Sequence, residues 1–367
     1  MSWVLTILGI VLLIVLHELG HFAVAKAVGM RVERFSLFFP PTLFRVRRGE
    51  TEYAIGAIPA GGYVKITGMN PEELEGLDPE AARRAYYAQP PWKRIVVIVA
   101  GPGVNILIAF VLFWAVLLTG NLNGARALES INPAVATLTP TVKAVEHGQP
   151  AEGALRASDR IVAVEGRPAT FTWTMEAINA HRCAGALVEG CRAATPVHLT
   201  VRRAGHNVAL SIYPRYNKKF KRMLIGFTFG AAPRQFGPLS AASASLSEMW
   251  HSTTQTLTGF VKALTNSKVR HEVSSIVGIT EVGQETVAAG TGYALVFLGY
   301  LSLILAVINL FPFLPLDGGH IAWSIAEKVR GKRVSLLAMY RFSSVGIVLL
   351  LFLVINGVSN DISRLTG

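Results

Sequence analysis

The stretch VLHELGHFAVAKAVG, residues 15–29, places two histidines, a glutamate and a lysine inside an apolar run that covers residues 3–28. A run of that length can cross the hydrocarbon core of a bilayer as a helix. Ionisable side chains inside a membrane span are costly, and by default they mark a functional site. His17, Glu18 and His21 are therefore the first candidates for chemistry in this chain.

The composition indicates a membrane protein. Of the 367 residues, 51% are hydrophobic and only 16% are charged. Two further windows, residues 95–118 and 293–311, are long enough to span a bilayer, and a shorter one, residues 342–358, adds a fourth. No Lys or Arg precedes the first run, so we interpret it as a retained span and not as a cleaved secretory signal. The sequence predicts a polytopic α-helical membrane protein with about four transmembrane helices.

Basic residues in the short connections predict the orientation of the chain. By the positive-inside rule these connections are cytoplasmic, whereas both chain ends and the long segment 120–292 lie on the outer side. The net charge of +12 favours contact with anionic lipid headgroups, and we expect no nucleic-acid partner. The basic residues concerned are Lys26, Arg31, Arg34, Lys93, Arg94, Lys328, Arg330, Lys332 and Arg333.

The outer segment has the composition of a soluble domain between residues 140 and 214. Its run PAEGALRASDRIVAVEGRPATFTW, residues 150–173, resembles the PDZ domain, which captures extended peptides at a sheet edge. We expect an inserted extracytoplasmic PDZ-like α+β domain here. Cys183 and Cys191 both fall in this segment, where an oxidising compartment favours a disulfide; two free thiols are the alternative.

The spacing of the first candidate residues is typical of a zinc site. On a helix, His17 and His21 are one turn apart and face the same point, with Glu18 on the adjacent surface. This HExxH arrangement is used by zinc metalloproteases, in which the two imidazoles bind the metal and the carboxylate takes a proton from water. A pair of helix-packing histidines is the alternative interpretation.

A third ligand is expected from the segment NLFPFLPLDGGH, residues 309–320, where two prolines interrupt an apolar helix. Such broken structure survives at membrane depth only where protein buries it or where it lines a watery cavity. We predict Asp317 as the third ligand, which leaves the fourth position for water. His320 is the alternative third ligand. Asn309 would either hold a substrate carbonyl or cap the break.

The connection between the first two spans has the alternation of short strands, broken by Pro and Gly pairs. A strand edge from GAIPAGGYVKITG, residues 56–68, would pair with the backbone of an unwound substrate. A plain cytoplasmic hairpin is the alternative. The second span opens with AGPGVN, residues 100–105, where small residues and Asn105 are first interpreted as helix packing.

Together, HELGH, GPGVN and NLFPFLPLDGGH resemble the site-2 protease family of intramembrane zinc metalloproteases. The IPAGGYVKITG stretch and the single PDZ-like insertion are similar to its bacterial branch, which cleaves anti-sigma factors. The resemblance implies that His17, His21 and Asp317 bind one zinc ion and that Glu18 is the catalytic base. It also implies a membrane-reentrant β-element at residues 57–67. The implied substrate-binding residues are Asn309, Asn105, Gly61, Gly62 and Tyr63.

The resemblance further implies regulated intramembrane proteolysis of single-span substrates, such as anti-sigma factors or remnant signal peptides, already cleaved by another protease. It implies a multi-pass protein of the inner (plasma) membrane whose other partners are lipids. A non-enzymatic PDZ membrane scaffold and a metal transporter are the alternative functions.

The predicted order of segments follows from these assignments. It is: first transmembrane helix with HExxH, 1–29; membrane-associated β-element and cytoplasmic loop, 30–93; second helix, 94–120; PDZ-like domain, 121–215; membrane-proximal amphipathic region, 216–291; third helix with the LDG motif, 292–327; cytoplasmic loop, 328–341; fourth helix, 342–360.

Overall fold

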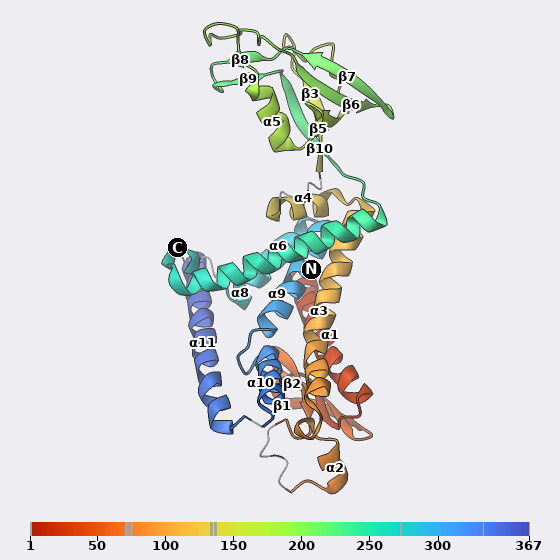
Figure 1. The fold of residues 1–367 in the computed structure, drawn as a ribbon, viewed down its shortest axis with the longest axis vertical. Coiled ribbons are helices and arrows are strands. Elements are labelled where there is room, and N and C mark those ends of the chain that lie inside the picture. The colour runs from red at the N-terminus through yellow and green to blue at the C-terminus, as the bar shows by residue number, and fades with distance from the viewer. Residues whose placement is uncertain are drawn as a thin grey trace. The chain divides into compact units, whose positions relative to one another are not determined.

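The computed structural model of the protein describes residues 2–69, 73, 76–132, 135, 138–271, 274–332 and 334–366. The chain divides into two compact units (Figure 1). Met1–Ala115 and Ser245–Gly367 form one of them, which we call the helical unit. Val116–Ala244 form the other, which we call the β unit.

Four helices in the described part of the chain are long and apolar enough to cross a membrane. They are α1 (Ser2–Ala27), α3 (Pro91–Thr119), α9 (Thr291–Asn309) and the stretch Leu337–Arg364 of α11 (Leu336–Thr366). The prediction of about four apolar helices is confirmed. The last is longer than the predicted window, because the mostly apolar residues 336–341 before it and the mostly polar residues 359–366 after it continue the helix.

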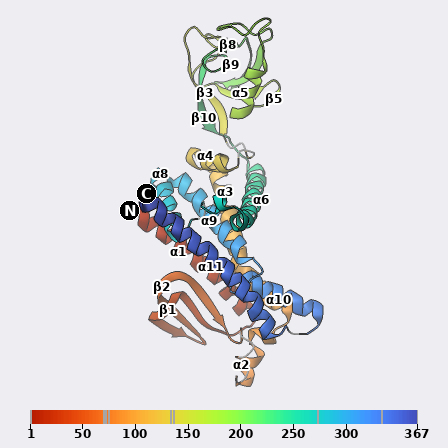
Figure 2. The same cartoon turned by 90° about the vertical axis from the view of Figure 1, so that its left-hand side faces the viewer.

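A small antiparallel sheet, β1 (Val32–Arg48) and β2 (Thr51–Ile66), lies beside α1 (Figures 1 and 2). Both strands bend. The first half of β1 therefore pairs with both halves of β2, and the second half of β1 pairs only with the first half of β2. Residues 61–66 consequently form one edge of the sheet. The ring of Phe22 on α1 packs 5.4 Å from that of Phe35 on the sheet, which fixes the sheet against the helix.

Several further helices complete the helical unit. After α9 the backbone leaves the helix at the prolines of residues 310–316, and α10 (Asp317–Arg330) begins at Asp317. A cluster of buried side chains joins the end of α1, the base of the sheet and the start of α3, with Met30, Tyr86 and Val97 among its members. The remaining helices are α2 (Pro79–Arg83), η2 (Tyr86–Ala88), α6 (Pro238–Thr265), α7 (Ser267–Arg270) and α8 (Ile276–Ala289).

The β unit contains a six-stranded sheet in the order β10-β3-β4-β6-β7, with β5 paired to β4. Its apolar residues alternate along the strands and, together with the helix α5, form one core that includes Ile161, Ile178 and Leu199. The elements are α4 (Leu122–Ile131), β3 (Leu138–Val145), β4 (Arg160–Val164), β5 (Arg167–Pro168), α5 (Phe171–Ala180), β6 (Val197–Arg203), β7 (His206–Ile212), β8 (Arg215–Asn217), β9 (Arg222–Leu224) and β10 (Phe227–Pro233).

The sheet of the β unit extends beyond residue 215, where the predicted domain ends. The run NKKFKRMLIGFTFG, residues 217–230, which belongs to the predicted membrane-proximal region, supplies β9 and the first half of β10. Phe227 pairs with Val145, and the pairing continues to Pro233 opposite Leu138. The physical reason is that β3 has β4 on one side only, so β10 completes its hydrogen bonding on the other.

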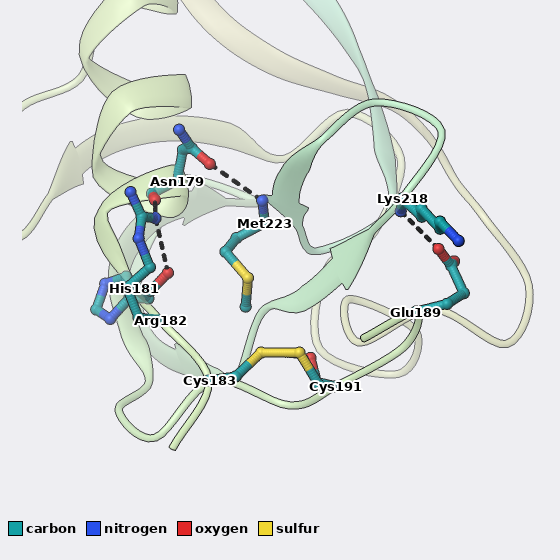
Figure 3. Close-up of a disulfide and its surroundings, with 8 residues drawn as sticks. All are labelled: Asn179, His181, Arg182, Cys183, Glu189, Cys191, Lys218 and Met223. Atoms are coloured by element: carbon teal, nitrogen blue, oxygen red, sulfur yellow. Dashed lines mark hydrogen bonds between the residues drawn. A yellow bond between two sulfur atoms is a disulfide. The ribbon is translucent and has the colours of Figure 1, made fainter. Parts of the chain in front are cut away.

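A disulfide joins Cys183 to Cys191, whose Cα atoms are 6.1 Å apart (Figure 3). The loop that it closes lies against the β8–β9 hairpin, because the Lys218 amide donates a hydrogen bond to Glu189 at 2.5 Å. On the other side of the hairpin the Met223 amide donates to the Asn179 side chain at 3.1 Å. The disulfide therefore stabilises the loop that packs against the β8–β9 hairpin of the β unit.

Candidate metal centre

Helix α1 supplies two imidazoles to one point. His17 and His21 lie one turn apart, and both are buried, with 5% and 6% of their surface exposed. Their Nε2 atoms are 3.3 Å from each other. The chain forms a helix here because the flanking residues are almost all apolar and no proline interrupts them.

Asp317, the first residue of α10, brings a carboxylate to the same point. Its Oδ2 lies 3.2 Å from Nε2 of His17 and 3.2 Å from Nε2 of His21. Glycine at the next position permits this placement, since a Cβ on Gly318 would lie 2.2 Å from the carbonyl oxygen of Leu310. The structure thus brings the three predicted ligands together, and they form the one His/Cys/Asp/Glu cluster of metal-binding geometry found among the described residues.

The spacing of these donor atoms fits a zinc ion. Ligand atoms about 2.0–2.1 Å from a tetrahedral zinc lie about 3.3–3.4 Å from one another. The three measured separations are 3.2, 3.2 and 3.3 Å. Asp317 Oδ2 is buried and, although it lies within ion-pair distance of both imidazoles, receives no hydrogen bond from the described residues. An anionic oxygen in that position requires a cation nearby.

Helix α3 orients His21. The Nδ1 atom of His21 lies 2.9 Å from the backbone carbonyl oxygen of Val97. A carbonyl can only accept, so Nδ1 carries the hydrogen and the neutral ring keeps its Nε2 lone pair for the metal position. Gly101 makes room for the ring, because a Cβ there would lie 2.2 Å from His21 Nε2. The glycines interpreted as general helix packing therefore include one that the site itself requires.

The cluster opens onto a cavity of about 630 Å³. The predicted catalytic and substrate-binding residues that line it, in addition to the cluster, are Glu18, Gly61, Gly62, Tyr63 and Asn309. His320, the alternative third ligand, also lines the cavity but does not belong to the cluster. Asn105 is absent from the described lining residues; it lies behind His17, with Nδ2 3.2 Å from the Nδ1 of that ring.

Glu18 faces the edge of the sheet. A Cβ on Gly62 would lie 2.9 Å from Glu18 Cγ, so the edge strand passes this carboxylate at close range because residue 62 has no side chain. The candidate base, the metal-binding cluster and a strand edge therefore border one cavity.

A buried ion pair joins the start of α3 to α10, the helix that begins at Asp317. Arg94 at the start of α3 contacts Glu327 on α10 at 2.6 Å, and both side chains are almost completely buried. The guanidinium also lies 5.1 Å from the ring centre of Tyr87. Arg94 was assigned only to membrane orientation in the sequence, and no motif singled out Glu327. Nothing in the sequence indicates that Arg94 and Glu327, which lie far apart in the chain, form an ion pair.

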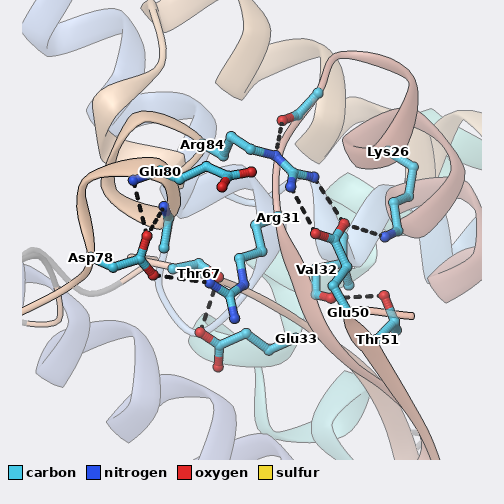
Figure 4. A network of polar contacts seen from close by, with 12 residues as sticks. Lys26, Arg31, Val32, Glu33, Glu50, Thr51, Thr67, Asp78, Glu80 and Arg84 are labelled. Atoms are coloured by element: carbon cyan, nitrogen blue, oxygen red, sulfur yellow. Dashed lines mark hydrogen bonds and ion pairs between the residues drawn. The ribbon is translucent and has the colours of Figure 1, made fainter. Parts of the chain in front are cut away.

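The end of α1 is held by a charged network (Figure 4). Glu50, at the turn between β1 and β2, accepts hydrogen bonds from Arg84 at 2.7 and 2.8 Å and from Lys26 at 2.6 Å. These partners, Arg84 first, lower the pKa of Glu50 to about 2. The network therefore stays ionised at neutral pH and ties the last turn of α1 to the sheet.

Comparisons with known proteins identify relatives along almost the whole chain. The sequence matches the family described as Peptidase family M50 over residues 5–353. It is 34% identical over 352 residues to zinc metalloprotease Rip1 of Mycobacterium tuberculosis, covering 89% of this chain and 86% of that protein. It is 32% identical over 362 residues to zinc metalloprotease Rip1 of Mycolicibacterium smegmatis, again covering 89% and 86%.

Proposed function

The chain belongs to peptidase family M50 and is a zinc metalloendopeptidase, and from this premise we propose that it hydrolyses peptide bonds within transmembrane segments of single-span proteins. The observation that carries the proposal is the position of the donor cluster. Two of its members lie well inside α1, a helix long and apolar enough to span a membrane. A site at that depth meets peptide bonds that are themselves in the bilayer.

The proposed roles follow from the geometry. His17, His21 and Asp317 hold the zinc ion, which when bound polarises a carbonyl and lowers the pKa of water from about 15.7 to about 7. Glu18 borders the same cavity, accepts the proton of the attacking water and returns it to the leaving nitrogen. Asn309 also borders the cavity, where its amide can donate to a substrate carbonyl.

The edge strand at residues 61–66 is proposed to hold the substrate. A transmembrane helix shields its peptide bonds with its own hydrogen bonds, so it must unwind before hydrolysis, and its freed backbone groups then need partners. The strand pairs with β1 on one side, and the described residues provide no strand on the other. Gly61, Gly62 and Tyr63 border the cavity from this edge, which supports a reentrant β-element that adds the substrate as a further strand.

The β unit is proposed to be a PDZ-like domain that limits which substrates reach the site. A cavity of about 320 Å³ lies among α5, the β8–β9 hairpin and β10, lined by Met175, Ile178, Met223, Phe227 and Phe229 among others. β10 is an end strand of its sheet, so an extended peptide can add to it. A substrate whose outer domain has been removed by another protease would pass this filter, whereas an intact one would not.

The proposed filter can be tested by comparing substrates with and without a folded outer domain. Cleavage by the intact protein should fall as a folded outer domain is added to a transmembrane substrate. Replacement of residues 138–233 by a flexible linker should make cleavage independent of that domain. If the linker variant still discriminates between the two substrates, the β unit is not the filter.

The proposed location is the inner (plasma) membrane, as a multi-pass protein with the β unit outside the cytoplasm. The Cys183–Cys191 disulfide supports an oxidising compartment for that unit. The proposed partners are lipids and single-span substrates, with anti-sigma factors and remnant signal peptides as the classes to examine first. Labelling of cysteines introduced into the β unit of intact cells by a membrane-impermeant reagent tests this orientation.

The central experiment uses Glu18→Gln in purified protein reconstituted with a transmembrane peptide. We expect one zinc per chain in the wild type and in the variant, because the ligands are unchanged. Turnover should fall by roughly 10²- to 10⁴-fold, since a general base contributes about that much. The matched control is Glu281→Gln, an exposed carboxylate on α8, which should leave turnover unchanged. Undiminished turnover by Glu18→Gln would remove Glu18 from the chemistry.

A further inference from the structure

Asn105, on α3, is the polar side chain in contact with Nδ1 of His17, the ring nitrogen that is not part of the metal-binding cluster. It is completely buried, and its Nδ2 lies 3.2 Å from His17 Nδ1. The hydroxyl of Ser302 on α9 donates a hydrogen bond to the Asn105 backbone carbonyl at 2.9 Å, which holds this turn of α3 in place. The Asn105 Oδ1 atom is also buried and has no hydrogen-bond partner among the described residues.

The two imidazoles need the same tautomer if both are to bind a metal through Nε2. His21 has it, because the Val97 carbonyl can only accept a hydrogen bond and so keeps the hydrogen on Nδ1. His17 needs an acceptor opposite its own Nδ1. An amide NH₂ in that position would instead donate to Nδ1 and leave the hydrogen on Nε2, where it would block the metal. Rotating the Asn105 amide by half a turn exchanges the positions of Nδ2 and Oδ1. Oδ1 then accepts a hydrogen bond from Nδ1 of His17, so the ring gains its acceptor and the oxygen gains a partner.

We propose that Asn105 is a positioning residue whose amide oxygen selects the metal-binding tautomer of His17, and that it does not hold substrate. This inference rests on the proposed role of His17 as a zinc ligand. The cavity supports it, because Asn309 is among its described lining residues and Asn105 is not. Helix α3 thus orients both histidines of α1, one through the Val97 carbonyl and the other through a side-chain amide.

The test measures the zinc dissociation constant of the full-length protein in detergent by competition with a chromogenic chelator. Asn105→Leu keeps the size of the side chain but removes the acceptor, and we expect zinc binding weaker by roughly 10- to 100-fold. Asn105→Asp keeps an acceptor oxygen and should bind zinc within a few-fold of the wild type. Rescue by Asp but not by Leu would not follow from simple packing.

Asn309→Leu is the matched control, because it makes the same change on an amide that lines the cavity. It should leave the zinc dissociation constant unchanged and raise KM for a transmembrane peptide. Asn105→Leu should regain most of its kcat at saturating zinc, with KM unchanged. Zinc binding by Asn105→Leu as tight as that of the wild type, or loss of binding in both Asn105 variants, would overturn the inference.

Failure of the proposed function gives a different result. If the wild-type protein itself holds no zinc, or if His17→Ala leaves zinc binding intact, the metal-binding cluster is wrong whatever the Asn105 variants do. If the wild type binds zinc through His17 and Asn105→Leu binds it equally well, only the positioning role is wrong.

Discussion

At the scale of single residues, the sequence identifies atoms that carry chemistry better than atoms that position them. HExxH names His17, Glu18 and His21 because their spacing places them on adjacent helix surfaces. The Val97 carbonyl that orients His21 leaves no trace in the sequence, because every residue has a carbonyl. Gly101 was visible in GPGVN, but only the tertiary contact explains why that position has no side chain.

A substitution at Gly101 tests the closeness of α1 and α3. In Gly101→Ala the new Cβ would lie 2.2 Å from His21 Nε2, so the ring must move away from the position it needs for zinc. We expect zinc affinity to fall at least roughly 10-fold, as for loss of an orienting group. Metal content after dialysis against a weak chelator measures the effect.

Gly103→Ala is the matched control for this prediction, since a Cβ at Gly103 meets no atom within 4 Å. It lies two residues further along the same helix and should retain zinc as the wild type does. Equal zinc retention by the two alanine variants would contradict the steric account of Gly101.

At the scale of elements, the break between α9 and α10 is the feature that completes the cluster. The prolines of residues 310–316 predict an interruption, and the structure has one, with α10 beginning at Asp317. The sequence does not say where the second helix points after the break. That direction depends on close packing of Gly318 against the preceding carbonyls and on the Arg94–Glu327 ion pair.

Alanine at Gly318 should therefore affect both stability and metal binding. Its Cβ would lie 2.2 Å from the Leu310 carbonyl oxygen and 2.3 Å from that of Phe311. Because both are backbone atoms, they cannot move away without a substantial cost in free energy. We expect a loss of about 1–3 kcal/mol in the free energy of unfolding. Zinc affinity should also fall, because Asp317 is the adjacent residue. Thermal unfolding and chelator competition on the same preparation measure both effects.

Gly259→Ala provides the comparison for Gly318. Gly259 lies inside α6, and a Cβ there meets no atom within 4 Å. Because alanine is a better helix former than glycine, this variant should be equally or more stable. Wild-type zinc affinity and unfolding temperature in Gly318→Ala would show that α10 does not need this close approach.

At the scale of the whole molecule, the basic residues that predict the orientation of the chain also form ion pairs. Lys26, Arg31 and Arg34 predicted a cytoplasmic connection, and each of them is paired with a carboxylate in the structure. The positive-inside rule counts basic residues and not net charge, so the predicted orientation is unaffected by these pairs. It stays a prediction, as do the reentrant and PDZ-like assignments.

The β unit should lose stability in acid. Asp159 is almost completely buried and accepts hydrogen bonds from Arg203 at 2.6 and 2.8 Å. These bonds lower its pKa below the ordinary value. A carboxyl group whose pKa is lower in the folded state stabilises it fully above the unfolded value, about 3.9. That contribution disappears as the pH falls from about 3.9 through the lower folded pKa.

Asp159→Asn should therefore destabilise the β unit by about 2 kcal/mol at pH 7, in the range for a hydrogen bond to a charged group. The difference from the wild type should shrink as the pH falls below about 3.9. Pulse proteolysis in urea, with thermolysin at neutral pH and pepsin in acid, measures it in the full chain. Glu176→Gln, an exposed carboxylate on α5 of the same unit, is the control and should have little effect. A difference that does not depend on pH would exclude the ionic explanation.

The sequence by itself determined the class of this protein. Four apolar windows, HExxH and the LDG segment were enough to predict a membrane protein of the site-2 protease family, and membership of family M50 confirms that prediction. Hydropathy and helical spacing are local properties, so they can be read without a fold. The soluble composition of residues 140–214 is local in the same way. By contrast β10, which lies beyond the predicted domain, was not assigned to it because its place depends on pairing with a distant β3.

The tertiary structure alone decided which atoms meet. It brought Asp317 to within 3.2 Å of both imidazoles across almost the whole length of the chain, and it separated Asn309, which lines the cavity, from Asn105, which lies behind His17. Contacts of this kind depend on helix packing, on glycines that allow backbones to approach and on the direction of a chain after a break. None of these is a local property, which is why residue types predicted the chemistry and only the fold could assign each residue its partner.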